Sequence, residues 1–144
     1  MTVKAILSAK GGSVVTIDPN ANVEAAAKVL AERRIGALVV TGAGERVVGI
    51  VSERDIVQAL AGRGTAALAV PLTEVMTRKV ATCTQSDTIS SIMSRMTEGK
   101  FRHVPVVEQG RLVGIVSIGD VVKHHIAAVE FEASSLRGYI AAVG

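Results

Sequence analysis

The sequence predicts an α+β fold made of two β-α-β-β-α repeats, followed by a C-terminal helical extension. Residues 46–57 (RVVGIVSERDIV) and residues 111–122 (RLVGIVSIGDVV) agree at eight of their twelve positions. The segments that precede them also correspond, so a unit of about 65 residues occurs twice. Within each unit, short β-rich runs alternate with amphipathic stretches, and this order predicts a mixture of helices and strands.

Each repeat begins with a short β-rich run, Val14–Ile17 in the first copy and Val80–Cys83 in the second. A helix follows after the N-cap residue Asn22 or Thr88, because a short polar side chain there accepts hydrogen bonds from free backbone N–H groups. The apolar face of this helix has helical spacing in both copies, with Val23, Ala26, Ala27 and Leu30 in the first and Ile89, Ile92, Met93 and Met96 in the second.

Two strands and a second helix complete each repeat. The strands are joined by a turn that contains glycine, and we expect them at Ala37–Val40, Val47–Val51, His103–Val107 and Leu112–Val116. The second helix opens at Ser52 in the first copy and at Ser117 in the second. Because the strands are apolar without interruption, both faces of each sheet should be buried between packed lobes.

The predicted domains are residues 1–66 for the first repeat with an N-terminal leader, 67–131 for the linker and second repeat, and 132–144 for the C-terminal helical extension. Gly62–Pro71 is the expected linker between the repeats. Even the leaders correspond, since Ala5–Leu7 resembles Glu74–Met76.

The segment Val121–Val143 extends beyond the repeat and is predicted to form a long helix. Its apolar residues are spaced by three or four positions and form one stripe: Val122, Ile126, Val129, Ala133, Leu136 and Ile140. This stripe fits either ordinary packing against the body of the protein or a seam with the same helix of a second subunit. Both interpretations remain open from the residues.

Composition excludes several classes of protein. Only one Tyr and two Phe are present, and the 16 Lys and Arg are scattered among 13 Asp and Glu, so nucleic-acid binding is not expected. No stretch without a charge, Gly64–Thr73 included, approaches the roughly 18 apolar residues that cross a bilayer. The first residues lack a secretory apolar segment, and the lone Cys83 permits no internal disulfide. We therefore expect a cytoplasmic protein without a membrane segment, and its thin aliphatic core favours a second subunit.

The shared G-I-V-S-x-x-D motif has two interpretations. A serine three residues before an acid at the start of a helix is a capping arrangement, which Ser52 with Asp55 and Ser117 with Asp120 both fit. The same geometry can hold a nucleotide, because free N–H groups at a helix N-terminus favour phosphate. A carboxylate one turn into the helix would accept hydrogen bonds from ribose hydroxyls. The motif alone leaves both interpretations open.

Taken together, the two copies resemble a known family. The segments VVTI…NVEAAAKVLAERRIGALVV…RVVGIVSERDIV and VATC…TISSIMSRMTEGKFRHVPVV…RLVGIVSIGDVV look like two tandem cystathionine β-synthase (CBS) domains. Such a pair forms a Bateman module, here of the stand-alone bacterial or archaeal type. The resemblance covers almost the whole chain and implies pseudo-twofold packing of the repeats, with two clefts between them that bind AMP, ADP, ATP, NAD(H) or related adenosyl ligands.

The resemblance implies a regulatory sensor that is not an enzyme, requires no cofactor, and assembles into a homodimer with an unidentified protein target. The alternative is a dimeric protein-interaction module whose clefts are vestigial.

The resemblance also implies roles for individual residues. Asp55 and Asp120 match the acid that binds ribose, and Ser52 and Ser117 match the hydroxyl residue near it. The first-strand segments, which match the part that lines base and phosphate, are Thr16, Ile17 and Asp18 in the first copy and Thr82, Cys83 and Thr84 in the second. Arg102 and His103 fall where the family often places basic residues toward phosphates.

The copies differ at some of these positions. Ala37 and Val39 stand where the second copy has His103 and Pro105, so the first cleft is expected to lack those basic groups. Arg54 could compensate there, and Gly119 replaces it in the second copy. We therefore expect two related sites with unequal ligand preferences.

Other candidates have weaker support. Cys83, His103, His124 and His125 lack the spacing of metal ligands, and Cys83 has no recognisable base to make it a nucleophile. Gly42–Gly44 is interpreted as a hairpin turn rather than a dinucleotide loop, because a strand follows it. Arg33 and Arg34 fit a solvated helix end or a phosphate contact.

Overall fold

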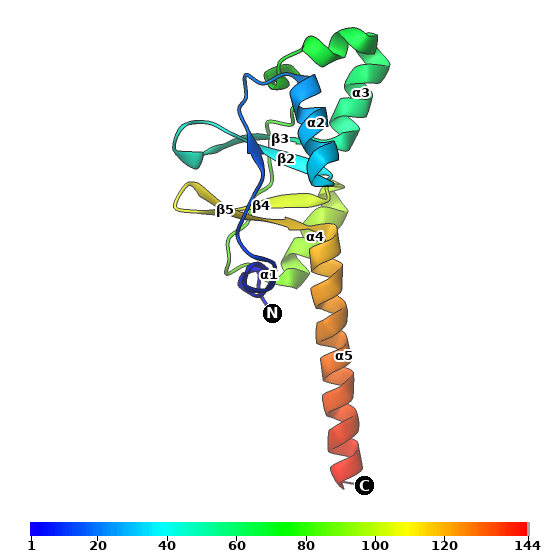
Figure 1. Ribbon diagram of the computed structural model, residues 1–144. Helices are drawn as coiled ribbons and strands as arrows, with labels where there is room; N and C mark the ends of the chain where they lie inside the picture. Colours follow the sequence, from blue (N-terminus) through cyan, green and yellow to red (C-terminus); the bar gives the residue numbers. More distant parts are fainter. Residues whose placement is uncertain (144) are drawn as a thin grey trace.

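The computed structural model describes residues 1–143 and has two lobes stacked on each other, with a long helix projecting from one of them (Figure 1). The first lobe contains a three-stranded sheet in the order β1-β2-β3, and the second contains the pair β4-β5. In Figure 1 the loops of both hairpins lie on one side, while helices α2, α3 and α4 lie on the other. The predicted α+β fold of two repeats with a C-terminal helix is confirmed.

The first lobe follows the predicted order closely. Its elements are β1 (Thr16–Ile17), α2 (Val23–Arg33), β2 (Ala37–Thr41), β3 (Val47–Ser52) and α3 (Glu53–Arg63). Strand β1 pairs in parallel with β2, and β2 pairs antiparallel with β3. The Asn22 side chain accepts a 2.9 Å hydrogen bond from the Ala25 N–H and so caps α2 as predicted. Strand β1 is shorter than predicted, since Val14 and Val15 lie outside it.

The second lobe repeats this order with one difference. Its elements are α4 (Ile89–Gly99), β4 (His103–Glu108), β5 (Arg111–Ser117) and the start of α5 (Ile118–Val143). The strand predicted at Val80–Cys83 is absent, and only Cys83 pairs in parallel with Val106. Cys83 donates to the Pro105 carbonyl at 3.0 Å and accepts from Val107 at 2.8 Å. The next donor in that ladder would be the backbone nitrogen of Pro105, which carries no hydrogen, so the pairing stops.

The predicted linker Gly62–Pro71 is largely helical. Gly62 and Arg63 belong to α3, and Gly64–Ala69 forms the 3₁₀ helix η2. Ala67 is fully buried against the first lobe, which explains why the segment is ordered rather than extended. A further 3₁₀ turn, η3 (Leu72–Glu74), leads into the second repeat.

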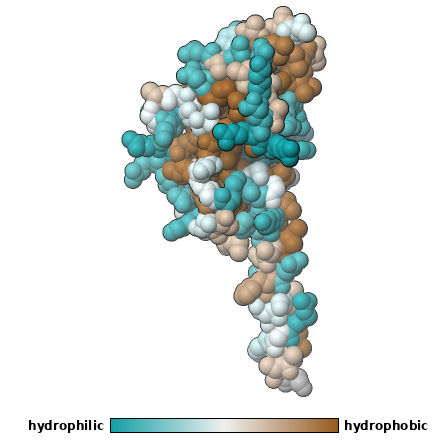
Figure 2. All heavy atoms as spheres, viewed as in Figure 1, coloured by the Kyte–Doolittle hydropathy of each residue, from teal (hydrophilic) through white to brown (hydrophobic). Residues whose placement is uncertain are grey.

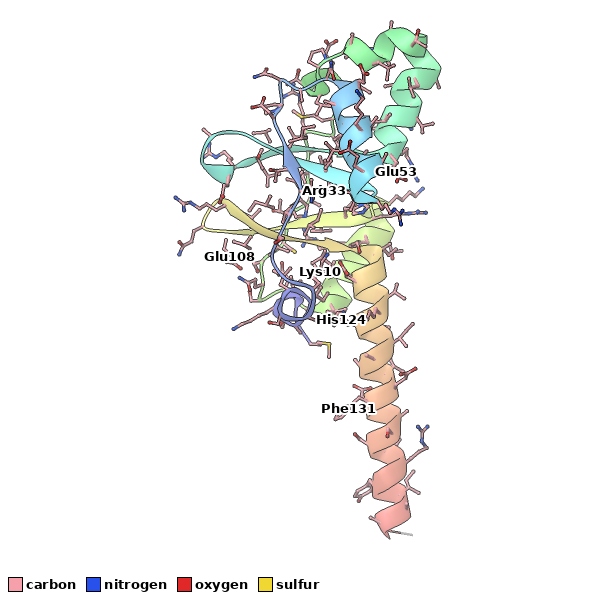
Figure 3. All side chains as sticks on the ribbon, in the orientation of Figure 1. Lys10, Arg33, Glu53, Glu108, His124 and Phe131 are labelled. Carbon is pink, nitrogen blue, oxygen red and sulfur yellow. The ribbon has the colours of Figure 1, made fainter. Side chains whose placement is uncertain are left out.

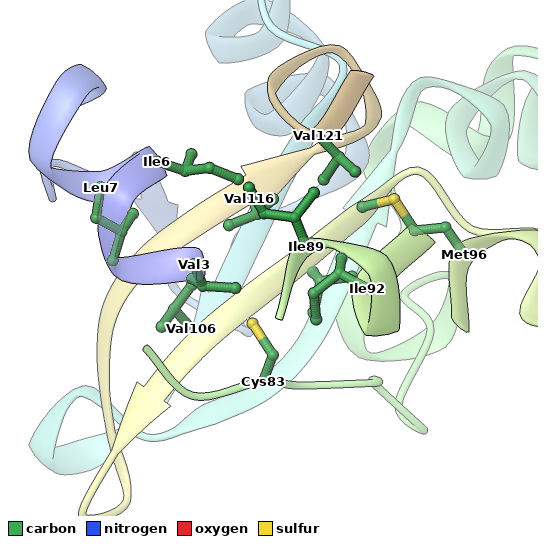
Figure 4. Packing of buried hydrophobic residues seen from close by; sticks show 11 residues of the cluster. Val3, Ile6, Leu7, Cys83, Ile89, Ile92, Met96, Val106, Val116 and Val121 are labelled. Carbon is green, nitrogen blue, oxygen red and sulfur yellow. The ribbon is translucent and has the colours of Figure 1, made fainter. Parts of the chain in front are cut away.

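The segments that precede the repeats are exchanged between the lobes. Helix α1 (Val3–Lys10) precedes the first repeat, yet its Val3, Ile6 and Leu7 pack into the core of the second lobe (Figure 4). In return, Leu72 and Met76, which precede the second repeat, pack into the core of the first. Each fully buried aliphatic side chain contributes about 1.5–3 kcal/mol, so the exchange ties the lobes together. The domain boundaries at residues 66 and 131 stay a prediction.

Two equivalent glycines make room for this exchange. A Cβ atom on Gly49 would lie 2.5 Å from the Met76 sulfur, and one on Gly114 would lie 2.6 Å from Leu7 Cδ2. The groups that approach these two glycines most closely are therefore side chains of the exchanged segments.

Helix α5 begins against α4, α1 and β5, and then projects well beyond the body (Figure 1). Val121 is fully buried, but the large side chains of the predicted stripe are exposed: Val122, Ile126, Val129, Leu136 and Ile140. The prediction of one long helix is confirmed, and the interpretation that the stripe folds back on the body does not hold. Residue 144 of the predicted extension lies outside the described residues. Within residues 1–143, none of the helices has both the length and the apolar character needed to cross a membrane.

Candidate functional site

The Ser–Asp pairs at the start of α3 and α5 have almost identical geometry. Asp55 Oδ2 accepts from the Ser52 backbone N–H at 2.9 Å and from its hydroxyl at 3.1 Å, while the Asp55 N–H donates to Ser52 Oγ at 3.2 Å. The corresponding distances for Asp120 and Ser117 are 2.9, 3.0 and 3.2 Å. Both pairs therefore cap their helices reciprocally, as one interpretation predicted.

Capping uses only one oxygen of each carboxylate. Among the described residues, no hydrogen-bond donor of the chain reaches Oδ1 of Asp55 or of Asp120. Since an ionised carboxylate can accept several hydrogen bonds, each acid can cap its helix and still accept hydroxyl donors from a ligand. The two interpretations of the motif are compatible.

The first cleft is a cavity of about 490 Å³ that contains Ser52 and Asp55. Its basic side chains come from both lobes: Arg54, Lys100, Arg102 and His103. Apolar wall is supplied by Ile50, Phe101 and Ile118. A hollow with a carboxylate at one point, several cations nearby and apolar surface between them suits a ligand that has hydroxyls, anionic groups and a flat ring.

The second cleft has a volume of about 400 Å³ and contains Ser117. Lys10, Arg34 and His103 are its basic residues. Val14, Val15, Ile35 and Ile115 provide apolar wall. Gly36, Ala37 and His103 line both clefts, so the two cavities meet along the start of β2 and β4.

The expectation that the first cleft lacks basic groups is wrong. The first cleft combines the Ser–Asp motif of the first repeat with the start of β4 from the second repeat, and the second cleft combines Ser117 with the start of β2 from the first repeat. Arg102 and His103 therefore face Asp55 across the lobes, together with Arg54 of the first repeat. The predicted difference in basic residues between the copies is real, but it enriches the first cleft instead of depleting it.

The first-strand residues predicted to line the ligand lie elsewhere. Thr16 lines a separate hollow of about 200 Å³, Ile17 packs on the first core, and exposed Asp18 accepts a hydrogen bond from the Asn20 backbone. In the second repeat, the Thr82 carbonyl accepts from Arg95, Cys83 is in the core, and Thr84 belongs to a turn with Asp87. Pro105 is buried in β4, and Gly119 is exposed beside the cap. Val14, Val15 and Thr77 line the clefts in their place.

Two further basic residues line the clefts. Lys100 was not predicted from the sequence, and the role of Arg34 was left open. Arg34 and Lys100 end α2 and α4 with φ of 54° and 55°, the left-handed region that normally favours glycine. Arg34 lines the second cleft and Lys100 the first. Lys100 could have been predicted by aligning the repeats, because both copies then have a basic residue directly after the first helix.

Lys10 distinguishes the second cleft. Its ammonium group lies 2.7 Å from Asp120 Oδ2 and 3.0 Å from the Ile115 carbonyl (Figure 3 labels Lys10 at the end of α1). Burial opposes ionisation of Asp120, but hydrogen bonds from Lys10 and Ser117 outweigh it, so the pKa of this carboxyl lies below its ordinary value of 3.8. The first cleft has no equivalent, because no lysine contacts Asp55 among the described residues.

His103 lines both clefts, and its surroundings favour the neutral form of the ring. Burial lowers the pKa of His103 from 6.5, and the positive charge of Lys10 lowers it further, while Glu53 and Asp120 oppose this change. An anionic ligand in either cleft would favour the protonated ring.

Comparison with known proteins agrees with this geometry. The family model described as "CBS domain" matches residues 3–62 and again residues 72–126. The chain belongs to the CBS domain family. A CBS-domain containing protein from Agrobacterium tumefaciens is 48% identical, with a TM-score of 0.84 over 87% of this chain and 99% of that one.

The similar solved structures include CBS proteins in complex with adenosyl ligands. The CBS domain pair of protein MJ0100, in complex with 5′-methylthioadenosine and S-adenosyl-L-methionine, is 29% identical with a TM-score of 0.79, over 89% of this chain and 98% of that one. A CBS domain protein from Pyrobaculum aerophilum complexed with AMP is 31% identical with a TM-score of 0.75, over 83% and 89%. This chain spans 66% and 71% of two curated relatives, from Acidianus ambivalens and Arabidopsis thaliana, but only 24% of longer Arabidopsis CBS proteins.

The alternative chemistry considered for Cys83 finds no support in this CBS pair. The side chain is 3% exposed within the second core, and burial raises the pKa of its thiol to about 11. Within residues 1–143 there is no cluster of three or more His, Cys, Asp or Glu side chains that could hold a metal ion.

Proposed function

We propose that this CBS pair is a regulatory module that binds a phosphorylated adenosyl ligand, such as AMP, ADP, ATP or NAD(H), in the first cleft. The observation that carries the proposal is the combination around Asp55: one carboxylate oxygen left over by the helix cap, and four basic side chains in the same cavity. The adenosyl complexes of the related CBS pairs support the ligand class.

Each part of such a ligand has a partner of suitable chemistry. The ribose hydroxyls donate to Asp55, in the way that an acidic residue binds ribose in dinucleotide sites. The phosphate lies toward Arg54, Lys100, Arg102 and His103, and the N-terminus of α3 adds its partial positive charge. Phe101 and Ile50 offer apolar surface to the base.

The charge of the first cleft favours phosphate-bearing ligands over neutral or cationic adenosyl compounds. Arg54, Lys100 and Arg102 outnumber the carboxylates Glu53 and Asp55 in its lining, before any contribution from His103. A sulfonium ligand such as S-adenosyl-L-methionine has no phosphate to neutralise them. We therefore rank AMP, ADP, ATP and NAD(H) above S-adenosyl-L-methionine and 5′-methylthioadenosine for this chain.

Regulation requires that the ligand bind two arrangements of the protein with different affinity. Because the first cleft is lined by residues of both lobes, a ligand there alters how firmly the lobes hold one another. The role proposed for this module is regulatory rather than enzymatic. Cytoplasmic location and an unidentified protein target remain predictions from the sequence.

Isothermal titration with AMP, ATP, NADH and 5′-methylthioadenosine tests the proposal, using wild type, Asp55→Ala and Glu45→Ala. Glu45 lies in the β2–β3 hairpin outside the first cleft and serves as the matched carboxylate control. We expect Asp55→Ala to weaken binding about 10- to 100-fold, the loss associated with charge-assisted hydrogen bonds of about 1.5–3 kcal/mol. Equal affinity in all three proteins, or no binding by wild type, would contradict it.

The second candidate is a dimeric interaction module with vestigial clefts. The exposed apolar stripe of α5 is the observation that favours it. A bound ligand raises the melting temperature of a protein, so the absence of any shift with all four adenosyl compounds would favour this candidate.

A further inference from the structure

The projecting part of α5 has the residue pattern of a two-stranded coiled coil. Its apolar positions repeat every seven residues, with Ile126, Ala133 and Ile140 at a and Val122, Val129 and Leu136 at d. The five large side chains of this set are between 42% and 60% exposed. Brown, apolar atoms also lie at intervals along the projecting helix in Figure 2. Helices with this repeat bury the a and d side chains against a partner helix.

The helix uses a different side to contact its own lobe. Val121 is fully buried there, and its neighbours His124 and His125 are half-buried, whereas Val122 and Ile126 remain exposed. The a and d stripe is therefore available from the first turns of α5 onward. From residue 130 to residue 142 the other sides of the helix are exposed as well.

The residues that flank the stripe are polar or charged and fit a second copy of the same helix. Glu132 occupies a g position and Arg137 the following e position, while His125 and Glu130 occupy the preceding pair. In a parallel coiled coil, a g residue of one helix meets the following e residue of the other. Glu132 then meets Arg137 of the second copy, and no described residue of its own chain forms an ion pair with either.

We infer that α5 pairs with α5 of a second copy as a parallel, in-register, two-stranded coiled coil. Charged residues at e and g leave only the narrow a and d stripe apolar, which suits two strands rather than three. An antiparallel pairing would set g opposite g and e opposite e, and would separate Glu132 from Arg137 of the second copy. The twofold axis runs along α5, so the two second lobes lie side by side at the same end of the dimer.

The α5–α5 interface is tested by measuring the mass of the full chain in solution, by sedimentation or light scattering. Wild type should have twice the monomer mass, and Ile126→Asp with Leu136→Asp should dissociate it. Phe131→Asp is the matched control, since Phe131 is 74% exposed on the same helix but at an f position, outside the stripe (Figure 3). A monomeric wild type, or a dimer that survives the double substitution, would overturn the inference.

Cysteine cross-linking tests the orientation, in a Cys83→Ser background. A parallel twofold pairs every residue with itself, so Val122→Cys and Leu136→Cys should both form an intermolecular disulfide. These positions are about 21 Å apart along the helix, and an antiparallel pair can bring at most one of them together with itself. Cross-linking at one position or at neither would overturn the parallel arrangement.

Charge reversal tests the contact between Glu132 and Arg137 of the second copy. Glu132→Arg should weaken the dimer, and Glu132→Arg with Arg137→Glu should restore it, because the reversed pair is again complementary.

Discussion

The ammonium group of Lys10 lies 2.7 Å from Asp120 Oδ2, although 110 residues separate them in the chain. The two carboxylates of the repeated motif consequently differ in their surroundings. Among the described residues, Oδ1 of both acids accepts no hydrogen bond, but Oδ2 of Asp120 forms an ion pair with Lys10 and no cation contacts Asp55 in this way. The same motif therefore offers a ribose two different sites.

Replacement of Lys10 should improve the second cleft. In Lys10→Ala, ribose hydroxyls no longer compete with the ammonium group for Asp120, and we expect adenosine to bind there roughly 2- to 5-fold more tightly, the range of a partly exposed ion pair. Calorimetry with adenosine, which carries no phosphate for Lys10 to attract, measures the effect. Lys4→Ala alters a lysine of the same helix and should change nothing. Weaker binding in Lys10→Ala would show instead that Lys10 holds the ligand.

The two acids should contribute unequally to AMP binding. Asp55→Ala should remove the tighter of two binding events. Asp120→Ala should leave it within about twofold, because Asp120 does not line the first cleft. Calorimetry of both variants with AMP distinguishes them. Identical isotherms for the two variants would refute the unequal-site hypothesis that the sequence predicts.

Replacing Gly49 or Gly114 by alanine should destabilise the protein. A Cβ on Gly49 or Gly114 overlaps Met76 or Leu7, and overpacking of this kind costs about 1–3 kcal/mol. Gly62→Ala is the control, because Gly62 lies in α3 and, its own helix backbone apart, no described atom lies within 4 Å of the added carbon. Alanine there should be neutral or stabilising by about 0.5–1 kcal/mol. Urea denaturation measures all three, and equal midpoints would contradict the proposed crowding.

Stability should fall as the pH drops below 6.5. Because the pKa of His103 is lowered in the folded protein, the unfolded chain takes up this proton more readily, and acid favours unfolding from 6.5 downward. The lowered pKa of Asp120 acts in the same direction at more acidic pH, below 3.8. Urea denaturation at about pH 7.5 and about pH 5.5 measures the loss. His103→Gln should lose less stability between these conditions than wild type, and an equal loss would assign the effect to other groups.

Cys83 should be protected from thiol reagents. Its side chain is buried, and a pKa of about 11 leaves almost no thiolate at pH 8. Ellman's reagent should label the folded protein far more slowly than the protein in denaturant. Rapid labelling without denaturant would mean that the second core opens readily.

The sequence predicted the features that depend on neighbouring residues. Asn22 and Thr88 cap their helices in the structure, and both Ser–Asp motifs form the expected reciprocal cap, because these contacts span only three residues. The strand predicted at Val80–Cys83 was wrong, and the signal missed there was Pro105, which lacks the N–H that a parallel ladder requires.

The sequence could not predict the contacts that depend on how the two lobes pack against each other. His103 belongs to the second repeat, but its strand faces the first motif, so the assignment of basic groups to clefts required the packing of the lobes. The contact of Lys10 with Asp120 likewise follows from the docking of α1 on the second lobe, which no local pattern indicates.

The exchange of leading segments has a consequence for the order of assembly during synthesis. Helix α1 leaves the ribosome before either repeat, but its docking surface includes Ile92, Val106 and Val116, which are made much later. The first lobe likewise waits for Leu72 and Met76 before its core is complete. Contacts between such distant parts slow folding, and neither repeat expressed alone contains all of its own core. A cut between the repeats should therefore yield two incomplete fragments that regain structure only when they are mixed.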